Sequence, residues 1–135
     1  MPSFSIKYNG HLKTTAIHDD SGTTITTAAP KDNKGDGSSF SPTDLFCVSV
    51  ATCKLTTMAI KAGSLGLNMD GVEMKVKKVM SSEPPRKVAE IVIDVNWNGK
   101  DQGISPEQME SLKRSAHHCP VSISIDPSVK QTVNW

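Results

Sequence analysis

The feature that most constrains the fold is a long apolar stretch over residues 41–62. It opens with SPTD, which places serine at the N-cap, proline at the first helical position and Asp44 where a capping box needs a carboxylate. Apolar residues then occupy nearly every face of the helical period, and the only charges, Lys54 and Lys61, share one narrow edge. A helix that is apolar almost all round is a buried helix. We therefore predict a central core helix that Gly63 ends.

Alternating, β-branched sequences lie on both sides of this helix. Turn formers separate the stretches before it, and Asn9-Gly10 is a typical two-residue hairpin turn. The stretches after it alternate with a period of two, which predicts strands with one buried face each. The predicted strands cover residues 4–8, 12–18 and 23–29 before the helix, and residues 71–79 and 88–97 after it.

A second helix is predicted over residues 105–118. SPEQ repeats the start signals of the first helix, and Pro120 cannot continue the helix. Residues 121–125 alternate as a further strand, and residues 129–135 form a last edge strand. The order β-β-β-α-β-β-α-β-β predicts an α+β fold in which mainly antiparallel sheets pack around the long helix. We expect a single domain over residues 1–135.

Composition narrows the classes of partner. Fifteen lysines and arginines against fourteen aspartates and glutamates leave a net charge of +1 and no basic stripe, so nucleic acid is not expected as a partner. No signal peptide is expected, because the first residues lack the apolar stretch that such a peptide needs. The apolar region 45–60 is predicted to be too short and too polar to span a membrane. A cytoplasmic location follows. Three cysteines in a chain of this length do not make a disulfide scaffold.

The cysteine positions do not by themselves activate a thiol. Cys53 lies deep in the first helix, far from its N-terminal dipole, and Cys119 lies at the C-terminal end of the second, where the dipole disfavours a thiolate. At an ordinary pKa of about 8.5, only roughly 3% of a thiol is ionised at pH 7. Each cysteine therefore also has a plain interpretation as a small buried residue. Cys47 points away from Cys53 on the same helix and is interpreted as packing.

A metal site is a further alternative. Zinc could be held by Cys119, by His117 or His118, and by Cys53, but no CxxC or HxxxH spacing supports such a site. The adjacent histidines point about 100° apart on a helix. They are more typical of polar helix-end residues that cap carbonyls. Packing, metal binding and thiol chemistry thus stay open on the residues alone.

Two segments together resemble the OsmC/Ohr family, named after osmotically inducible protein C and organic hydroperoxide resistance protein. These are SPTDLFCVSVATC, with a cysteine deep in the central helix, and AHHCPVSISI, with Cys-Pro-Val-Ser after the second helix. The likeness covers roughly residues 15–130, including the order of the elements. It implies the OsmC-like fold, an intertwined homodimer in which sheets wrap around the long central helices.

The resemblance also implies an activity. The family's two-cysteine peroxidases reduce organic hydroperoxides or hydrogen peroxide in oxidative stress defence, with no cofactor. By position, Cys53 would be the attacking thiolate and become a sulfenic acid. Cys119 would condense with it to a disulfide, and an external dithiol reductant would reset the pair.

The chain departs from the family at one point. There, a glutamate near the start of the central helix orients an arginine from the N-terminal region, which stabilises the thiolate. Ten residues before Cys53 this chain has Thr43, and its first arginine is Arg86. Asp44 is adjacent, but its capping role explains it without catalysis.

Lys13 or His18 could supply the missing cation, although neither has the two-pronged fit of arginine to a carboxylate. The missing pair motivates an alternative from a different class of protein. In that alternative the chain is a non-catalytic dimer that keeps the fold's pocket to bind a small apolar ligand or a partner.

Overall fold

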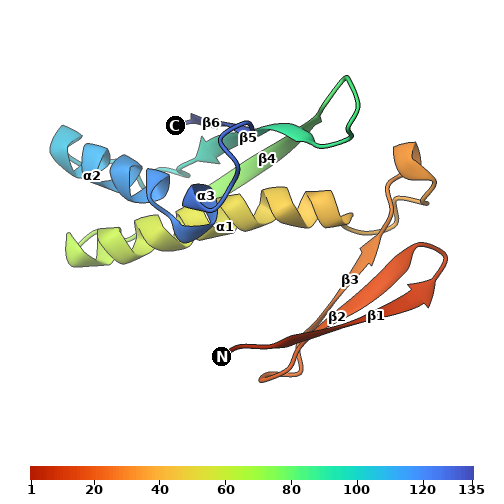
Figure 1. Cartoon of the computed structure of the whole chain (residues 1–135). Helices are drawn as coiled ribbons and strands as arrows, with labels where there is room; N and C mark the ends of the chain where they lie inside the picture. The colour runs from red at the N-terminus through yellow and green to blue at the C-terminus, as the bar shows by residue number, and fades with distance from the viewer. The chain divides into compact units, whose positions relative to one another are not determined.

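The computed structural model describes all of residues 1–135 and divides into two compact units, Met1–Phe46 and Cys47–Trp135. Helix α1 (Pro42–Ser64) begins in the first unit and runs on into the second (Figure 1). The single domain over residues 1–135 stays a prediction. Each unit is described by itself below.

The first unit is a three-stranded antiparallel sheet in the order β1-β2-β3, followed by the short helix η1 (Lys31–Asn33). Its strands are β1 (Phe4–Gly10), β2 (Lys13–His18) and β3 (Thr24–Ala28), which confirms the three predicted strands.

The predicted turn at Asn9-Gly10 is wrong by two residues. Gly10 still pairs with Lys13, and the turn is made by His11 and Leu12, whose φ angles are 55° and 60°. The left-handed conformation at both positions is the one that a two-residue hairpin requires. Gly10, with φ 87°, instead lies at an irregularity in the strand register, a conformation open to glycine.

Helix α1 begins with the predicted capping box. The backbone N–H of Ser41 donates to Asp44 Oδ2 (2.8 Å), and the backbone N–H of Asp44 donates to Ser41 Oγ (3.1 Å). Both hydrogen bonds satisfy donors that the first turn of a helix leaves without intrahelical partners. The helix ends at Ser64, and the left-handed glycine after it is Gly66 (φ 71°) instead of the expected Gly63.

One face of α1 is buried, whereas the sequence predicted burial nearly all round. The buried residues recur every three or four positions; they are Cys47, Val50, Ala51, Lys54, Met58 and Ala62. Ile60 on another face is 71% exposed. Lys54, which shares one narrow edge of the helix with Lys61, is only 1% exposed, and the sequence did not single out its burial.

By length and composition alone, α1 is long and apolar enough to cross a membrane, so the prediction that this region is too short and too polar for a span is wrong. Core helices of soluble proteins meet the same two criteria. The buried face of α1 packs within the second unit as such a core helix does.

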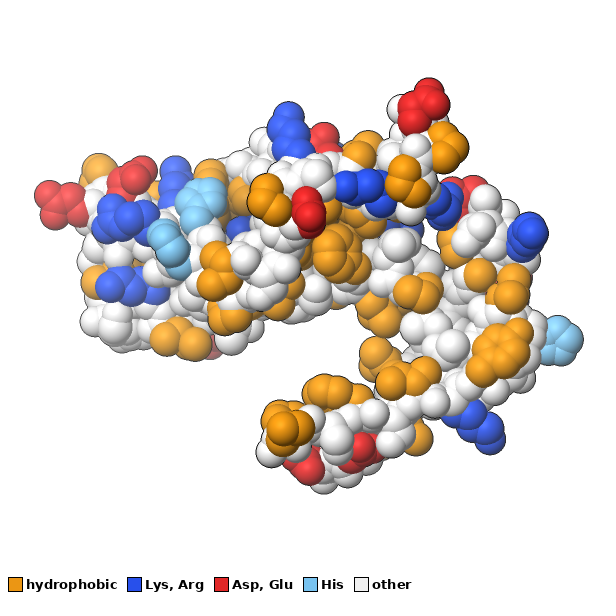
Figure 2. All heavy atoms as spheres, viewed as in Figure 1, with side chains coloured by type: hydrophobic (Ala, Val, Ile, Leu, Met, Phe, Trp, Pro, Cys, Tyr) orange, Lys and Arg blue, Asp and Glu red, His pale blue; other side chains and the backbone are white.

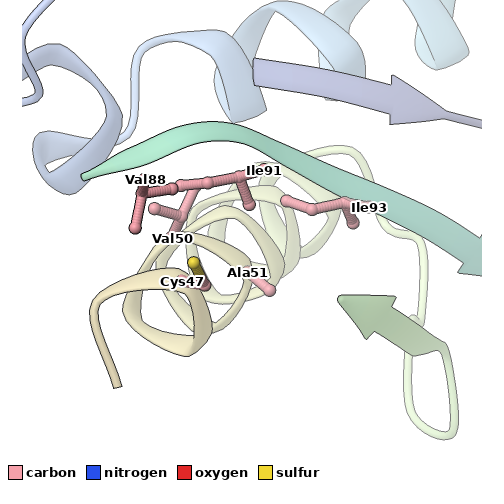
Figure 3. Packing of buried hydrophobic residues seen from close by; sticks show 6 residues of the cluster. All are labelled: Cys47, Val50, Ala51, Val88, Ile91 and Ile93. Carbon is pink, nitrogen blue, oxygen red and sulfur yellow. The ribbon is translucent and has the colours of Figure 1, made fainter. Parts of the chain in front are cut away.

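The second unit places α1 against a sheet in the order β4-β5-β6. Its strands are β4 (Glu73–Met80), β5 (Val88–Asn96) and β6 (Lys130–Asn134). β4 and β5 pair antiparallel, whereas β6 pairs parallel to β5, so the pairing is mainly antiparallel as predicted. The buried side chains of β5 meet the first half of α1 in one apolar cluster (Figure 3). Its members are Cys47, Val50, Ala51, Val88, Ile91 and Ile93.

Helix α2 (Pro106–His117) covers the second half of α1. It begins with a second capping box, in which the side chains of Ser105 and Gln108 each accept the other's backbone N–H. Its apolar stripe, with Leu112 and Ala116 fully buried, packs against Met58 and Ala62. The end of α2 is thereby fixed beside the middle of α1.

The predicted strand over residues 121–125 is wrong. Residues Pro120–Ile123 form a single helical turn, α3, with Cys119 as its N-cap and Pro120 at the first helical position. The backbone N–H of Ile123 donates to Cys119 O (3.2 Å), which closes the turn. Proline is favoured at the first position of a helix, and this signal outweighs a short apolar alternation that fits either element.

Burial predicts which substitutions destabilise the second unit. Ile91 is fully buried (0% exposed) and Ile123 is 68% exposed. We expect Ile91→Ala to lower the free energy of unfolding by about 3 kcal/mol, because it removes buried methyl groups and leaves a cavity. The matched control Ile123→Ala should cost less than about 1 kcal/mol. Urea unfolding of both variants measures the difference, and equal losses would contradict the core described above.

Candidate functional site

The two cysteines singled out by the sequence meet in the second unit. Cys53 lies in the middle of α1, and Cys119 lies between α2 and α3. Figure 1 shows these three helices. The side chains lie close enough for Cys53 to lower the pKa of the Cys119 thiol, and neither cysteine is in a disulfide. Cys53 is half-buried, whereas Cys119 is completely buried. The pair therefore has one partly exposed residue and one enclosed by protein.

Cys119 lies at the N-terminal end of a helical turn. The backbone N–H of Ser122 donates to Cys119 Sγ (3.4 Å), and the Cys119 thiol donates to Ser122 Oγ (3.1 Å). When the thiol ionises, the serine hydroxyl can rotate and donate to the sulfur instead. The sequence predicted that the dipole at the end of the second helix disfavours a thiolate at Cys119. This prediction is wrong, because Cys119 is also the N-cap of α3, which replaces the predicted strand.

The surroundings of Cys119 favour its anion. Burial raises the pKa of the Cys119 thiol, but the hydrogen bonds with Ser122, the neighbouring Cys53 side chain and the charge of Lys54 lower it by more. The net effect is a pKa below the ordinary value. A lowered pKa means that more of the thiol is ionised near neutral pH.

Lys54 completes the cluster. Its Nζ donates a buried hydrogen bond to the backbone carbonyl of Ala116 (3.0 Å), near the end of α2. The backbone N–H of Cys119 donates to the same carbonyl (3.5 Å). Burial lowers the pKa of Lys54, while Cys119 and Cys53 act to raise it. Sequence reasoning missed this residue, although a lysine directly after a cysteine in an otherwise apolar helix was a signal that could have found it.

The histidines before Cys119 point to other partners. His118 Nδ1 lies 2.8 Å from the carbonyl of Arg114, so His118 caps the helix end as predicted. The ring of His117 packs edge-on against Trp135 at 6.3 Å between centroids. No group of three or more His, Cys, Asp or Glu side chains is placed to hold a metal ion, so the zinc alternative has no ligand set here.

The comparisons with known proteins fit this arrangement. Residues 35–134 match the family model for OsmC-like proteins. The chain belongs to the OsmC-like family. No curated protein sequence matches it.

The solved structures similar to this OsmC-like protein cover nearly its whole length. A Psychrobacter arcticus protein, provisionally described as an osmotic stress induced and detoxification response protein, shares 39% identity over 99% of this chain and 95% of its own, with a TM-score of 0.91. An organic hydroperoxide resistance protein of Legionella pneumophila, also described as a predicted redox protein, shares 18% (99% and 95% covered, TM-score 0.71). OhrB of Bacillus subtilis shares 16% (99% and 96% covered, TM-score 0.65). The last two establish the likeness of fold alone.

The other candidates from the sequence of this OsmC-like protein are engaged elsewhere. Cys47 packs in the α1–β5 cluster, as interpreted from the sequence (Figure 3). Within the first unit, Lys13 pairs with Asp36 (2.9 Å) and His18 Nδ1 lies 2.7 Å from Ser21 Oγ. Neither of the two expected cations is therefore without a local partner.

The contacts of Ser122 predict how Cys119 titrates in the OsmC-like protein. Ser122→Ala removes the side-chain hydrogen bond that lowers the Cys119 pKa, so we expect that pKa to rise by about one pH unit. Thiolate absorbance against pH, in a background with Cys47→Ala and Cys53→Ser, reports Cys119 alone. Ser124→Ala is the matched control, because Ser124 donates to the carbonyl of Pro120 and not to the sulfur. A Cys119 pKa unchanged by Ser122→Ala would contradict this account.

Proposed function

We propose that the protein is a thiol-dependent peroxidase of oxidative stress defence, which reduces organic hydroperoxides or hydrogen peroxide with Cys53 and Cys119. The observation that carries the proposal is a pair of neighbouring thiols beside a buried ammonium group. Similar solved structures described as organic hydroperoxide resistance proteins support the choice of substrate.

The exposure of the two sulfurs supports Cys53 as the attacking residue. Cys53 is half-buried and Cys119 has no exposed surface, so a peroxide reaches Cys53 first. The neighbouring Cys119 sulfur can accept the proton of Cys53 as the peroxide approaches. The Cys53 thiolate then attacks one peroxide oxygen. The S–O bond forms and the O–O bond breaks. The leaving alkoxide takes the proton from Cys119 and becomes an alcohol, which leaves Cys119 as the thiolate.

Cys119 then resolves the oxidised residue. Its sulfur, as the thiolate, attacks Cys53 Sγ of the sulfenic acid; the S–S bond forms, and the hydroxide that leaves takes a proton and becomes water. An external dithiol reduces the disulfide by two successive exchanges and is itself oxidised to a disulfide. We place the protein in the cytoplasm, because dithiol reductants keep thiols reduced there.

We also propose a homodimer as the working form. Large apolar side chains are exposed on both units, more than a stable monomer usually shows (Figure 2). Those on the first sheet and its hairpin turn, on α1 and on the residues leading into it are Phe4, Ile6, Tyr8, Leu12, Ile25, Phe40, Phe46 and Ile60. The family resemblance, in which sheets wrap around paired central helices, gives these side chains a second copy as their partner.

The cysteine variants test the activity. The parent should consume cumene hydroperoxide with a dithiol reductant and form the Cys53–Cys119 disulfide after one equivalent of peroxide. Cys53→Ser should abolish consumption. Cys119→Ser should consume about one equivalent and stop at a sulfenic acid that dimedone traps. Peroxide assay and mass spectrometry of the trapped thiols provide the measurements.

Cys47→Ser is the control and should consume peroxide at the parent rate, because Cys47 packs in the core away from the pair. A Cys53→Ser variant as fast as the parent would refute the roles assigned here. A parent that consumes no peroxide would refute the enzyme and favour the non-catalytic binding dimer.

The dimer has its own test. The parent should elute with a mass about twice its 14.5 kDa chain mass in light-scattering chromatography. Ile60→Lys should shift the population towards monomer, because it places a charge on an exposed apolar face of α1. Lys61→Glu, one residue further along, is a control for charge on the helix. A monomeric parent would contradict the proposal.

A further inference from the structure

Lys54 is unusual among the buried residues, because it is the one charged side chain in the core. It lies on the face of α1 that packs against the rest of the second unit, where neighbouring positions hold alanine, valine and methionine. A buried ammonium is costly unless nearby groups compensate its charge and its hydrogen-bonding capacity. The first question is therefore what compensates Lys54.

The compensation comes from one carbonyl and two thiols. An ammonium has three N–H donors, and Lys54 directs one of them to the carbonyl of Ala116. The titratable groups that act on Lys54 are Cys119 from the α2–α3 junction and Cys53 from α1 itself, and both favour its charged form. The anion that can balance this buried cation is thus a thiolate of the pair.

Lys54 also ties together the two segments that carry the sulfurs. It follows Cys53 directly in α1, and its ammonium reaches the carbonyl to which the backbone N–H of Cys119 donates. The Nζ contact spans 62 residues of sequence. A single side chain therefore joins α1, next to Cys53, to the end of α2, just before Cys119.

We propose that Lys54 is the positioning residue of the thiol pair, which holds the Cys119 segment against Cys53 and stabilises the Cys119 thiolate. It thereby takes over, from within the central helix, the role that the family resemblance assigns to an arginine of the N-terminal region. This inference rests on the proposed peroxidase cycle, in which Cys119 reacts as a thiolate when it resolves the sulfenic acid.

The coupling can be measured without peroxide. If Lys54 and the Cys119 thiolate stabilise each other, removal of one must shift the titration of the other by the same free energy. Lysine side chains labelled with ¹³C report their ionisation by NMR, and Lys54→Arg assigns the Lys54 signal. We expect the titration midpoint of Lys54 to fall by about one pH unit in Cys119→Ser relative to the reduced parent. The midpoint of Lys61, in the last turn of the same helix, should stay unchanged.

Equal Lys54 midpoints in the parent and in Cys119→Ser would overturn the inference, whether or not the protein proves to be a peroxidase. The measurement also separates the proposal from a purely structural role. A lysine that only held the Ala116 carbonyl would titrate alike with cysteine or serine at position 119.

The second test is kinetic. Lys54→Met keeps the length and apolar stem of the side chain but removes the charge, and Lys61→Met is the matched control. After one equivalent of cumene hydroperoxide at pH 7, we expect the Cys53–Cys119 disulfide to form at least about tenfold more slowly in Lys54→Met, since one pH unit of lost ionisation is a factor of ten. Raising the pH should narrow the gap, because Cys119 then ionises without the ammonium.

The result expected is a slow, pH-rescued Lys54→Met and a Lys61→Met as fast as the parent. Disulfide formation at the parent rate in a folded Lys54→Met would overturn the inference. If the parent forms no disulfide, the peroxidase proposal fails by itself, and the lysine titration still decides the role of Lys54. The same titration, made on the cysteine variant, decides it if Lys54→Met does not fold.

Discussion

The hydrogen bond from Lys54 to the carbonyl of Ala116 is the contact on which the site depends. It is buried and joins the middle of the central helix to the end of α2, where the chain turns into α3. An ammonium placed there without this acceptor would pay its full desolvation cost, so the contact constrains where α2 must end. Because the backbone N–H of Cys119 shares that carbonyl, the position of the second sulfur follows from the same constraint.

Much of the fold followed from local sequence signals with clear physical causes. Both helix starts were predicted from serine and proline with an acceptor side chain three residues after the serine, and both capping boxes are present. The strands of the second sheet followed from strict alternation. The failures lie where two local signals compete. Residues 121–125 alternate like a strand, but Pro120 after an N-cap starts a helical turn. Asn9-Gly10 is a good turn pair, yet Gly10 lies at a register irregularity and His11-Leu12 make the turn.

The site could be predicted only in part, and the part depended on resemblance. Spacing along the sequence could not show that Cys53 and Cys119 are neighbours, because their contact depends on how α2 packs against α1 through Leu112 and Ala116. The error at residues 121–125 also reversed the expected electrostatics of Cys119, since a helical turn presents N–H groups to the sulfur where a strand would not. Lys54 was missed because the helical pattern placed it with Lys61 on one edge, and periodicity cannot show which edge of an isolated helix is covered.

In the proposed peroxidase cycle, the asymmetry of the two cysteines has a consequence for the direction of disulfide reduction. A thiol of low pKa is a weaker nucleophile than one of ordinary pKa at equal ionisation, but it is a better leaving group. Cys119 combines a lowered pKa with complete burial, so a reductant cannot reach its sulfur and gains from its departure. Cys53 is the partly exposed residue of the pair. Burial and electrostatics thus favour the same path, in which an external thiolate bonds to Cys53 and Cys119 leaves as an anion next to Ser122 and Lys54. If Cys119 were the exposed residue instead, the external thiolate would bond to Cys119, and Cys53 would have to leave in place of the better leaving group. The position of Cys119 as an N-cap inside the core is therefore what gives the pair a direction.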